Sequence, residues 1–228
     1  MIRNAHLMRI MGIQPKTVIH VGSHHGQDQT QYELLGVESV FWCEADPDCC
    51  NVIARIHPQS HVVHGFFWST ENTEIDFWIM RDRAQNSAFP PKIADAVSSK
   101  NKIISTTLDA KFADIKLTSP ILLVVDVQGS EIEVLKGGKK LLTLIDYVVC
   151  EITETSSVSN FSINQSEVEY FLSGYSFKSV LRRFSYNREY FDLLLIKGGF
   201  MRIKFIQTID LLFLSFISIR KVLKKAIG

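Results

Sequence analysis

The residues of this sequence that could do chemistry follow directly after apolar segments, where buried strands would end. Residues 22–26, with the sequence G-S-H-H-G, follow T-V-I-H-V, while Glu44 follows S-V-F-W-C and Asp126 follows I-L-L-V-V. Glycines allow a sharp turn and let a ligand lie against the backbone. A carboxylate can accept hydrogen bonds from ribose hydroxyls, remove a proton from a substrate hydroxyl or bind a cation. The three segments therefore point to one site that could hold a nucleoside beside a substrate hydroxyl.

The spacing between these segments carries more information than the glycine turn alone. Its glycines are spaced G-x-x-x-G, whereas dinucleotide-binding loops carry G-x-G-x-x-G and phosphate-binding loops carry G-x-x-x-x-G-K. Glu44 follows the turn by about twenty residues, which matches one strand-helix-strand unit with its acid at the ribose. Asp126 is open to two interpretations, because it could orient a substrate or simply cap the following helix.

Histidines gather in the turn itself. His24 and His25 could act as bases, because histidine titrates near neutral pH. Adjacent side chains normally point in different directions, so we expect the two not to act together. His61 and His64 would face opposite sides of a strand. No metal site is predicted from these histidines, and a cation held by Asp126 has no support in the pattern.

The elements that would position these residues alternate between apolar strands and helical stretches. Strands are expected at 17–21, 39–43, 61–64, 121–125, 147–150, 177–180 and 191–196, with helices after Gly26, Pro47, Ser130 and Asn164. This alternation predicts βαβ units in a doubly wound α/β sheet, which binds ligands beyond the carboxyl ends of its strands. An extra strand is expected at 74–80. Residues 81–100 read as a long loop that could cover the site.

Composition indicates a globular protein with one main domain at 1–198, including a short helix at 2–12. The net charge is +1, which does not favour nucleic acid as a partner. The four cysteines form no C-x-x-C pair and are expected to be small buried hydrophobes. The N-terminus lacks the pattern of a signal peptide, so a reducing cytoplasm is the expected compartment.

Several of these segments resemble the FkbM family of S-adenosylmethionine-dependent methyltransferases. The resemblance rests on GIQPKTVIHVGSHHGQDQ, FWCEADPD and VVCEI, and above all on LLVVDVQGSEIEVLKGG; it covers residues 12–197. It implies a Rossmann-like, seven-stranded methyltransferase sheet whose last strand is antiparallel. It also implies S-adenosyl-L-methionine as cofactor and O-methylation of a hydroxyl on a glycan or related metabolite.

The resemblance assigns roles to individual residues. The cofactor-binding set would be Gly22, Ser23 and Gly26 along the methionine and ribose, Glu44 at the ribose hydroxyls, and Ala45 and Asp46 beside the adenine. Asp126 would face the methyl acceptor. Because a hydroxyl acceptor benefits from loss of its proton, Asp126 is the expected base or orienter, with His24 or His25 as the alternative catalytic group.

Two positions depart from the family's D-V-G-A-N-x-G turn. His20 stands where the family has an acid, and His24 stands where it has asparagine. Because the acid is lost, a non-catalytic role as a binding or scaffold protein is kept as an alternative function. A nicotinamide-dependent oxidoreductase is a further alternative, disfavoured because G-x-G-x-x-G is absent.

The end of the chain, 199–228, forms a separate basic and apolar segment. Apolar residues recur at helical spacing through 205–225, but the longest uncharged apolar stretch is shorter than the roughly twenty residues that cross a bilayer. An amphipathic C-terminal helix is predicted, either lying on the inner face of a membrane or packed against protein. The oligomeric state is not predicted.

Overall fold

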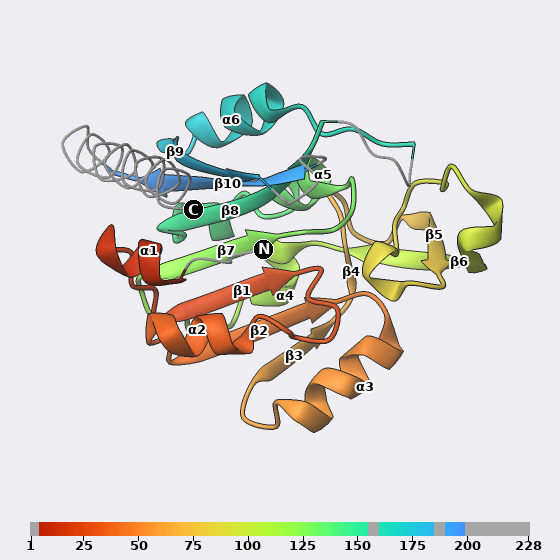
Figure 1. The fold of residues 1–228 in the computed structure, drawn as a ribbon, viewed down its shortest axis with the longest axis horizontal. Coiled ribbons are helices and arrows are strands. Elements are labelled where there is room, and N and C mark those ends of the chain that lie inside the picture. The colour runs from red at the N-terminus through yellow and green to blue at the C-terminus, as the bar shows by residue number, and fades with distance from the viewer. Residues whose placement is uncertain (1–4, 155–159, 185–189, 199–228) are drawn as a thin grey trace, which may run out of the picture.

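The structure is a computed structural model that describes residues 5–154, 160–184 and 190–198 (Figure 1). Its central feature is a seven-stranded sheet with the order β3-β2-β1-β7-β8-β10-β9. These strands span β1 Thr17–Val21, β2 Ser39–Glu44, β3 His61–His64, β7 Ile121–Val125, β8 Tyr147–Thr153, β9 Phe177–Phe184 and β10 Tyr190–Lys197. β10 runs antiparallel to both β8 and β9, whereas β3, β2, β1, β7 and β8 pair in parallel. The expected α/β sheet with an antiparallel last strand is confirmed.

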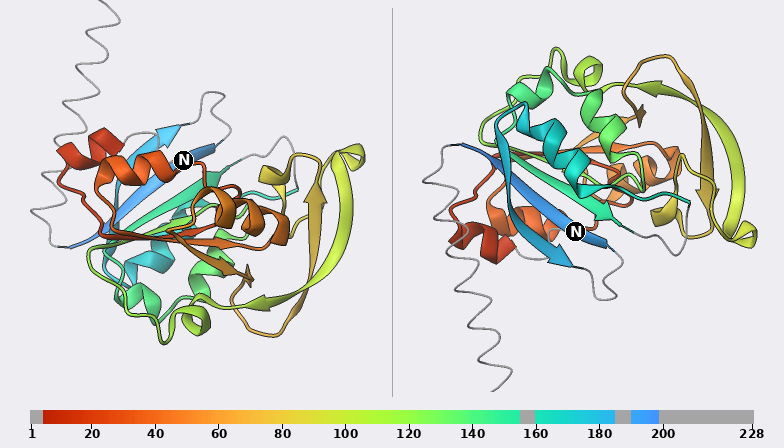
Figure 2. Two further views of the ribbon diagram at one scale, coloured as in Figure 1. Left: turned by 90° about the horizontal axis from the view of Figure 1, so that it is seen from below. Right: turned by 90° about the horizontal axis from the view of Figure 1, so that it is seen from above.

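Helices cover both faces of this sheet (Figure 2). The first face carries α1 Ala5–Ile10, α2 Gln29–Leu35 and α3 Pro47–Ile56, and the second carries α4 Leu108–Phe112, α5 Glu131–Lys136 and α6 Gln165–Ser173. Alternate residues of each strand supply the two cores. In β1, for example, Val18 packs with the first group of helices and Ile19 with the second. The doubly wound arrangement follows from strands that are apolar on both faces.

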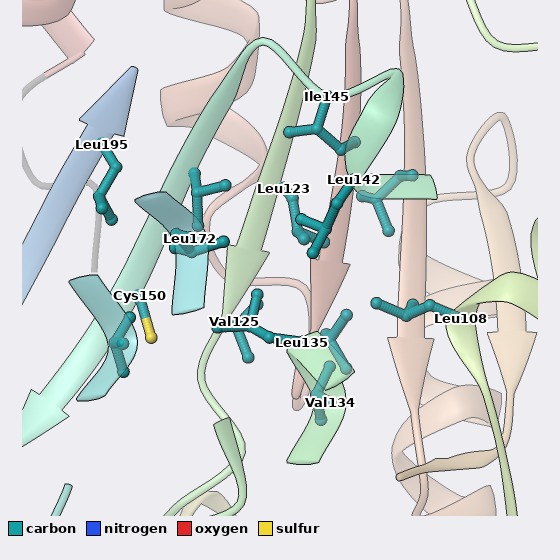
Figure 3. Packing of buried hydrophobic residues seen from close by; sticks show 14 of the residues in the cluster. Leu108, Leu123, Val125, Val134, Leu135, Leu142, Ile145, Cys150, Leu172 and Leu195 are labelled. Atoms are coloured by element: carbon teal, nitrogen blue, oxygen red, sulfur yellow. The ribbon is translucent and has the colours of Figure 1, made fainter. Parts of the chain in front are cut away.

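The second core is the larger one, and Figure 3 shows its packing. Leu123 and Val125 of β7 lie against Val134 and Leu135 of α5, and all four side chains are fully buried. Burying an aliphatic side chain of this size stabilises the fold by about 1.5–3 kcal/mol. This packing fixes the start of α5, and with it the turn that leaves β7 at Asp126.

A smaller sheet is inserted between β3 and β7. It has the order β4-β6-β5, formed by β4 Phe66–Phe67, β5 Glu74–Met80 and β6 Val97–Thr106. The expected strand at 74–80 is confirmed. The expected loop at 81–100 is wrong in its second part, because β6 begins at Val97 after two short 3-10 helices, Arg83–Gln85 and Ala94–Ala96. β6 is exposed along most of its length, so no apolar alternation marks it in the sequence.

Most strand boundaries agree with expectation, and the others extend the strands, whereas the first helix ends at Ile10, short of the expected residue 12. β8 and β9 continue to Thr153 and Phe184, beyond the expected ends at 150 and 180. α2 ends at Gly36, whose φ of 76° makes it a left-handed C-cap. The expected C-terminal amphipathic helix at 199–228 lies outside the described residues. Within those residues, no helix is long and apolar enough to cross a membrane.

Candidate active site

The parallel register aligns the chemistry-bearing residues at one edge of the sheet. Val21 pairs with both Cys43 and Val125, and Val125 also pairs with Cys150. The next residue of each strand or strand end is therefore Gly22, Glu44, Asp126 or Glu151. These four residues form one row at the carboxyl ends of the strands, where ligands bind in open α/β sheets.

The backbone conformation at residue 22, in the centre of this row, requires glycine. Its φ is 79°, and a Cβ built on it would lie 1.7 Å from the carbonyl oxygen of Asp126. Its N–H donates to the carbonyl of Cys43 at 2.9 Å. The close approach of the first turn to β7 therefore needs glycine, whatever ligand the turn binds.

Glu44 is buried and accepts hydrogen bonds from three backbone N–H groups. His24 donates to Oε2 at 2.7 Å, while Ala45 and Asp46 donate to Oε1 at 2.8 and 2.9 Å. Burial nevertheless raises the pKa of Glu44 to about 7, against the opposing effect of these donors. A carboxylate offers about four lone-pair sites, so Glu44 keeps acceptor capacity for a ligand hydroxyl.

Asp46 joins the start of α3 to the inserted segment. Its Oδ1 accepts the N–H of Asp48 as an N-cap, and its Oδ2 accepts from Arg83 Nη1 at 2.6 Å and from Asn86 Nδ2 at 3.1 Å. Asn86 in turn accepts the N–H of Met80 at 2.8 Å. Asp46 thus anchors the segment that lies over the row of strand ends.

An open cavity lies between the strand ends and the inserted segment. Its empty space is about 490 Å³, a figure that includes open solvent at its mouth. Its polar lining includes His24, Glu44, Arg83, Asn86, Asp126 and Gln128, and its apolar lining includes Val21, Phe66, Phe67 and Phe77. Gly22 and Ala45 also line it. Ser23, Gly26 and Asp46 lie outside this lining, and the Ser23 hydroxyl instead faces the carbonyl of Cys43.

Asp126, at the cavity wall, forms a buried acid pair with Glu151. Gln128 Nε2 donates to Asp126 Oδ1 at 2.9 Å and to Glu151 Oε2 at 3.0 Å. Burial raises the pKa of both carboxyls, and the negative charge of Asp126 raises the pKa of Glu151 further. The pair therefore holds a proton more readily than two exposed carboxyls would, and Asp126 is the member that lines the cavity.

Glu131 holds the turn that carries this pair. It is fully buried, and it accepts the N–H of Val127 at 3.0 Å and that of Gly129 at 3.0 Å. Ser87 of the inserted segment donates its hydroxyl to the carbonyl of Gln128 at 2.7 Å. The turn after β7 is thus held in place by Glu131 of α5 and by Ser87 of the inserted segment.

The histidines of the glycine turn lie differently from expectation. His24 has a φ of 48°, and its ring stacks on that of His25 with centroids 3.8 Å apart. The expectation that these adjacent side chains diverge is wrong, because it assumed ordinary backbone angles. Left-handed positions favour asparagine and histidine among non-glycine residues, which explains why His24 can replace the family's asparagine.

His20 does not line the cavity. It is fully buried beneath α2, where its Nδ1 lies 2.8 Å from the Tyr32 hydroxyl and its ring packs against Trp42. Burial lowers its pKa to about 3, so the imidazole is neutral. The replacement of the family's acid at this position therefore changes the core behind the turn and leaves the cavity wall intact.

Comparison with known proteins gives the family. The sequence profile of the methyltransferase FkbM domain matches residues 20–186. The chain belongs to the FkbM methyltransferase family. The matched segment includes the glycine turn, the acid row and the inserted sheet. This FkbM domain is an S-adenosylmethionine-dependent methyltransferase, and no curated protein matches it in sequence.

Several solved methyltransferase structures are similar to this FkbM domain at low sequence identity. A putative RNA methyltransferase from Pyrococcus horikoshii shares 12% identity over 87% of this chain and 84% of its own, with a TM-score of 0.48. TrmK from M. capricolum, in complex with S-adenosylhomocysteine, shares 10% over 87% and 73%, with a TM-score of 0.48. The 1,6-didemethyltoxoflavin-N1-methyltransferase of Burkholderia thailandensis shares 12% over 87% and 78%, with a TM-score of 0.46.

The lining of this cavity is compatible with S-adenosylmethionine in both its polar and its apolar groups. Glu44 would offer a carboxylate to the ribose hydroxyls, and Gly22 leaves its side of the cavity free of a side chain. Phe66, Phe67 and Phe77 would supply apolar surface for an aromatic base. The residues that sequence reasoning missed are Gln128 and Arg83, because each acts through a contact between distant segments.

Proposed function

We propose that this FkbM domain transfers a methyl group from S-adenosylmethionine to a hydroxyl of a glycan or related metabolite, with Asp126 as the base. The observation that carries the proposal is the position of Asp126. It is a buried carboxylate, lines the same cavity as Glu44 and shares the Gln128 amide with Glu151.

Methyl transfer to oxygen needs a base more than it needs leaving-group activation, because a bound sulfonium supplies a methyl group that is already activated. The new carbon–oxygen bond forms as the carbon–sulfur bond breaks, and the hydroxyl proton passes to a carboxylate oxygen of Asp126. A base is most effective when its pKa lies near the working pH. Burial raises the pKa of Asp126 in that direction.

Two further roles are assigned at the same edge of the sheet. Glu44 holds the ribose hydroxyls, with Gly22, Ser23 and Gly26 shaping the turn beside the methionine and with Ala45 and Asp46 beside the adenine. His24, which also lines the cavity, is the alternative catalytic group. Burial and the neighbouring His25 lower its pKa, which keeps the imidazole neutral and able to accept a proton.

The inserted segment over the cavity favours a small molecule or a sugar as the methyl acceptor. Arg83 and Asn86 are held in place by Asp46, and Phe89 packs against Phe161 with ring centroids 5.9 Å apart. Fixed polar groups beside aromatic surface are typical of small-molecule sites. Methyl acceptance by free monosaccharides, oligosaccharides and their amine analogues would separate O-methylation from N-methylation.

The test of the proposal combines Asp126→Asn with two measurements. Transfer of a labelled methyl group from S-adenosylmethionine to the best hydroxyl acceptor should fall at least a hundredfold, the lower end of general-base effects. Calorimetric affinity for S-adenosylmethionine should stay within a few-fold of the unaltered protein. Asp114→Asn, at an exposed aspartate, is the matched control. Full turnover by Asp126→Asn would remove Asp126 as the base, and an absence of cofactor binding in the unaltered protein would favour the scaffold alternative.

A further inference from the structure

The left-handed turn at His24 brings together three side chains that are ligands for soft and borderline metal ions. His24 and His25 come from the turn between β1 and α2, and Cys49 comes from the first turn of α3. One candidate ligand atom from each residue lies within 4.8 Å of the other two. We propose that His24, His25 and Cys49 bind a divalent cation of the zinc class.

The backbone of the turn makes this arrangement available. With ordinary backbone angles, adjacent imidazoles would point away from each other. The φ of 48° at His24 instead stacks the two rings with an interplanar angle of 26°. The left-handed turn therefore brings a nitrogen of each ring within 4.8 Å of the Cys49 thiol, and the rings would rotate out of the stack for their in-plane lone pairs to converge on one ion.

Cys49 is the third proposed ligand. It is fully buried, whereas both imidazoles are only partly covered. An ion would thus reach the thiol from the side of the histidines. The neighbouring Cys50 does not share this position, because its Sγ faces the carbonyl of Glu44 at 3.6 Å.

The chemistry of the three ligands selects the metal. Imidazole and thiolate are preferred by zinc and by cobalt, whereas calcium and magnesium require oxygen ligands. Three protein ligands leave one tetrahedral position for water, as in zinc sites that are not closed. Asp82 and Asp46 place negative charge near His24, and Arg83 offsets that of Asp46 through its ion pair.

Binding would link the glycine turn to α3. Asp46 already caps that helix, and the N–H of His24 already donates to Glu44. The ion would add a direct link between the turn and α3 without requiring a bound cofactor. Because His24 also lines the cavity, the proposal is tested with metal alone, without any measurement of methyl transfer.

The experiment titrates Co²⁺ into untagged, metal-free protein and follows the absorption spectrum. We expect one equivalent to bind, with tetrahedral d–d bands and a thiolate-to-cobalt charge-transfer band, and Zn²⁺ should displace it. Cys49→Ser should abolish the charge-transfer band, and His25→Ala should weaken Co²⁺ binding at least tenfold. Cys50→Ser, one residue away on the same helix, should keep the band.

Thermal melting without metal shows whether each variant is folded. Addition of Zn²⁺ should raise the melting temperature of the unaltered protein and of Cys50→Ser, but not that of Cys49→Ser, because only a native-state site stabilises the fold. If Cys49→Ser does not fold, the Co²⁺ titration and the melting temperature with Zn²⁺ are compared between His25→Ala and the unaltered protein instead. The proposal is overturned if the unaltered protein shows no charge-transfer band, if Cys49→Ser retains it, or if His25→Ala binds Co²⁺ as tightly as the unaltered protein.

Discussion

Asp126 and Glu151 share one hydrogen-bond donor, the side-chain amide of Gln128, which lies 2.9 Å from the first carboxyl group and 3.0 Å from the second. The donor comes from a turn, whereas the acids come from the ends of adjacent parallel strands. The charge state of the pair therefore depends on a residue that belongs to neither strand end. This dependence can be tested through the pH profile of methyl transfer.

Gln128→Met should shift the acid limb of kcat/KM to higher pH. The Gln128 amide lowers the pKa of Asp126 by donating to its charged form, so removal of that donor raises the pKa. More alkaline solution is then needed to form the carboxylate that accepts the proton. The measurement is kcat/KM from pH 5 to pH 9 for both proteins. An unshifted acid limb, with cofactor affinity retained, would show that Asp126 is not the group that titrates.

Glu131→Gln should reduce the pH dependence of stability. Burial and the charge of Asp126 raise the pKa of Glu131 to about 8, whereas an unfolded glutamate titrates near about 4.3. Between these values the folded state binds more protons than the unfolded state. The free energy of unfolding therefore falls as pH rises through this window, by on the order of 1 kcal/mol per pH unit for one such group.

The neutral amide of Glu131→Gln removes that contribution while keeping an acceptor for the N–H groups of Val127 and Gly129. Denaturant unfolding at pH 5.5 and pH 7.5 provides the measurement. The variant should lose less stability than the unaltered protein between the two values. An equal loss in both would mean that Glu131 does not carry the pH dependence.

Gly22→Ala and Gly36→Ala form a matched pair that separates backbone strain from steric clash. Both glycines have positive φ, 79° and 76°, but a Cβ at Gly22 would meet the carbonyl of Asp126 at 1.7 Å, and one at Gly36 meets nothing within 4 Å. Gly36→Ala should cost about 1–2 kcal/mol, the usual cost of the left-handed conformation. Gly22→Ala should lower the melting temperature far more or prevent folding. Equal melting temperatures would show that β1 and β7 can separate at little cost.

Deletion of residues 199–228 should move the protein from the membrane fraction to the soluble fraction. The prediction comes from the sequence of 205–225, in which apolar residues recur at helical spacing and Lys204, Arg220, Lys221, Lys224 and Lys225 add positive charge. Such segments bind anionic lipid surfaces. Flotation with vesicles of anionic and of neutral lipid measures the effect. Unchanged flotation after deletion would favour packing of this segment against protein.

Much of the fold could be predicted because the central strands are continuous apolar runs. The expected bounds of β1 and β7 agree with the structure, since parallel strands buried on both faces leave a clear signal. β6 gave no such signal, because most of its side chains are exposed and lack alternation. The acids after the strands were recognisable by their positions, and the family resemblance supplied their expected roles.

The sequence by itself determined where the strands of the large sheet lie along the chain, the glycine turn, and the presence of Glu44 and Asp126 at strand ends, because these depend on local pattern and spacing. Tertiary structure decided which groups meet. Gln128 reaches two acids because β7 and β8 are adjacent, and His24 stacks on His25 because its backbone is left-handed. Cys49 lies near both histidines because α3 packs beside the first turn. These contacts depend on dihedral angles and on distances between remote segments, which residue order does not specify locally.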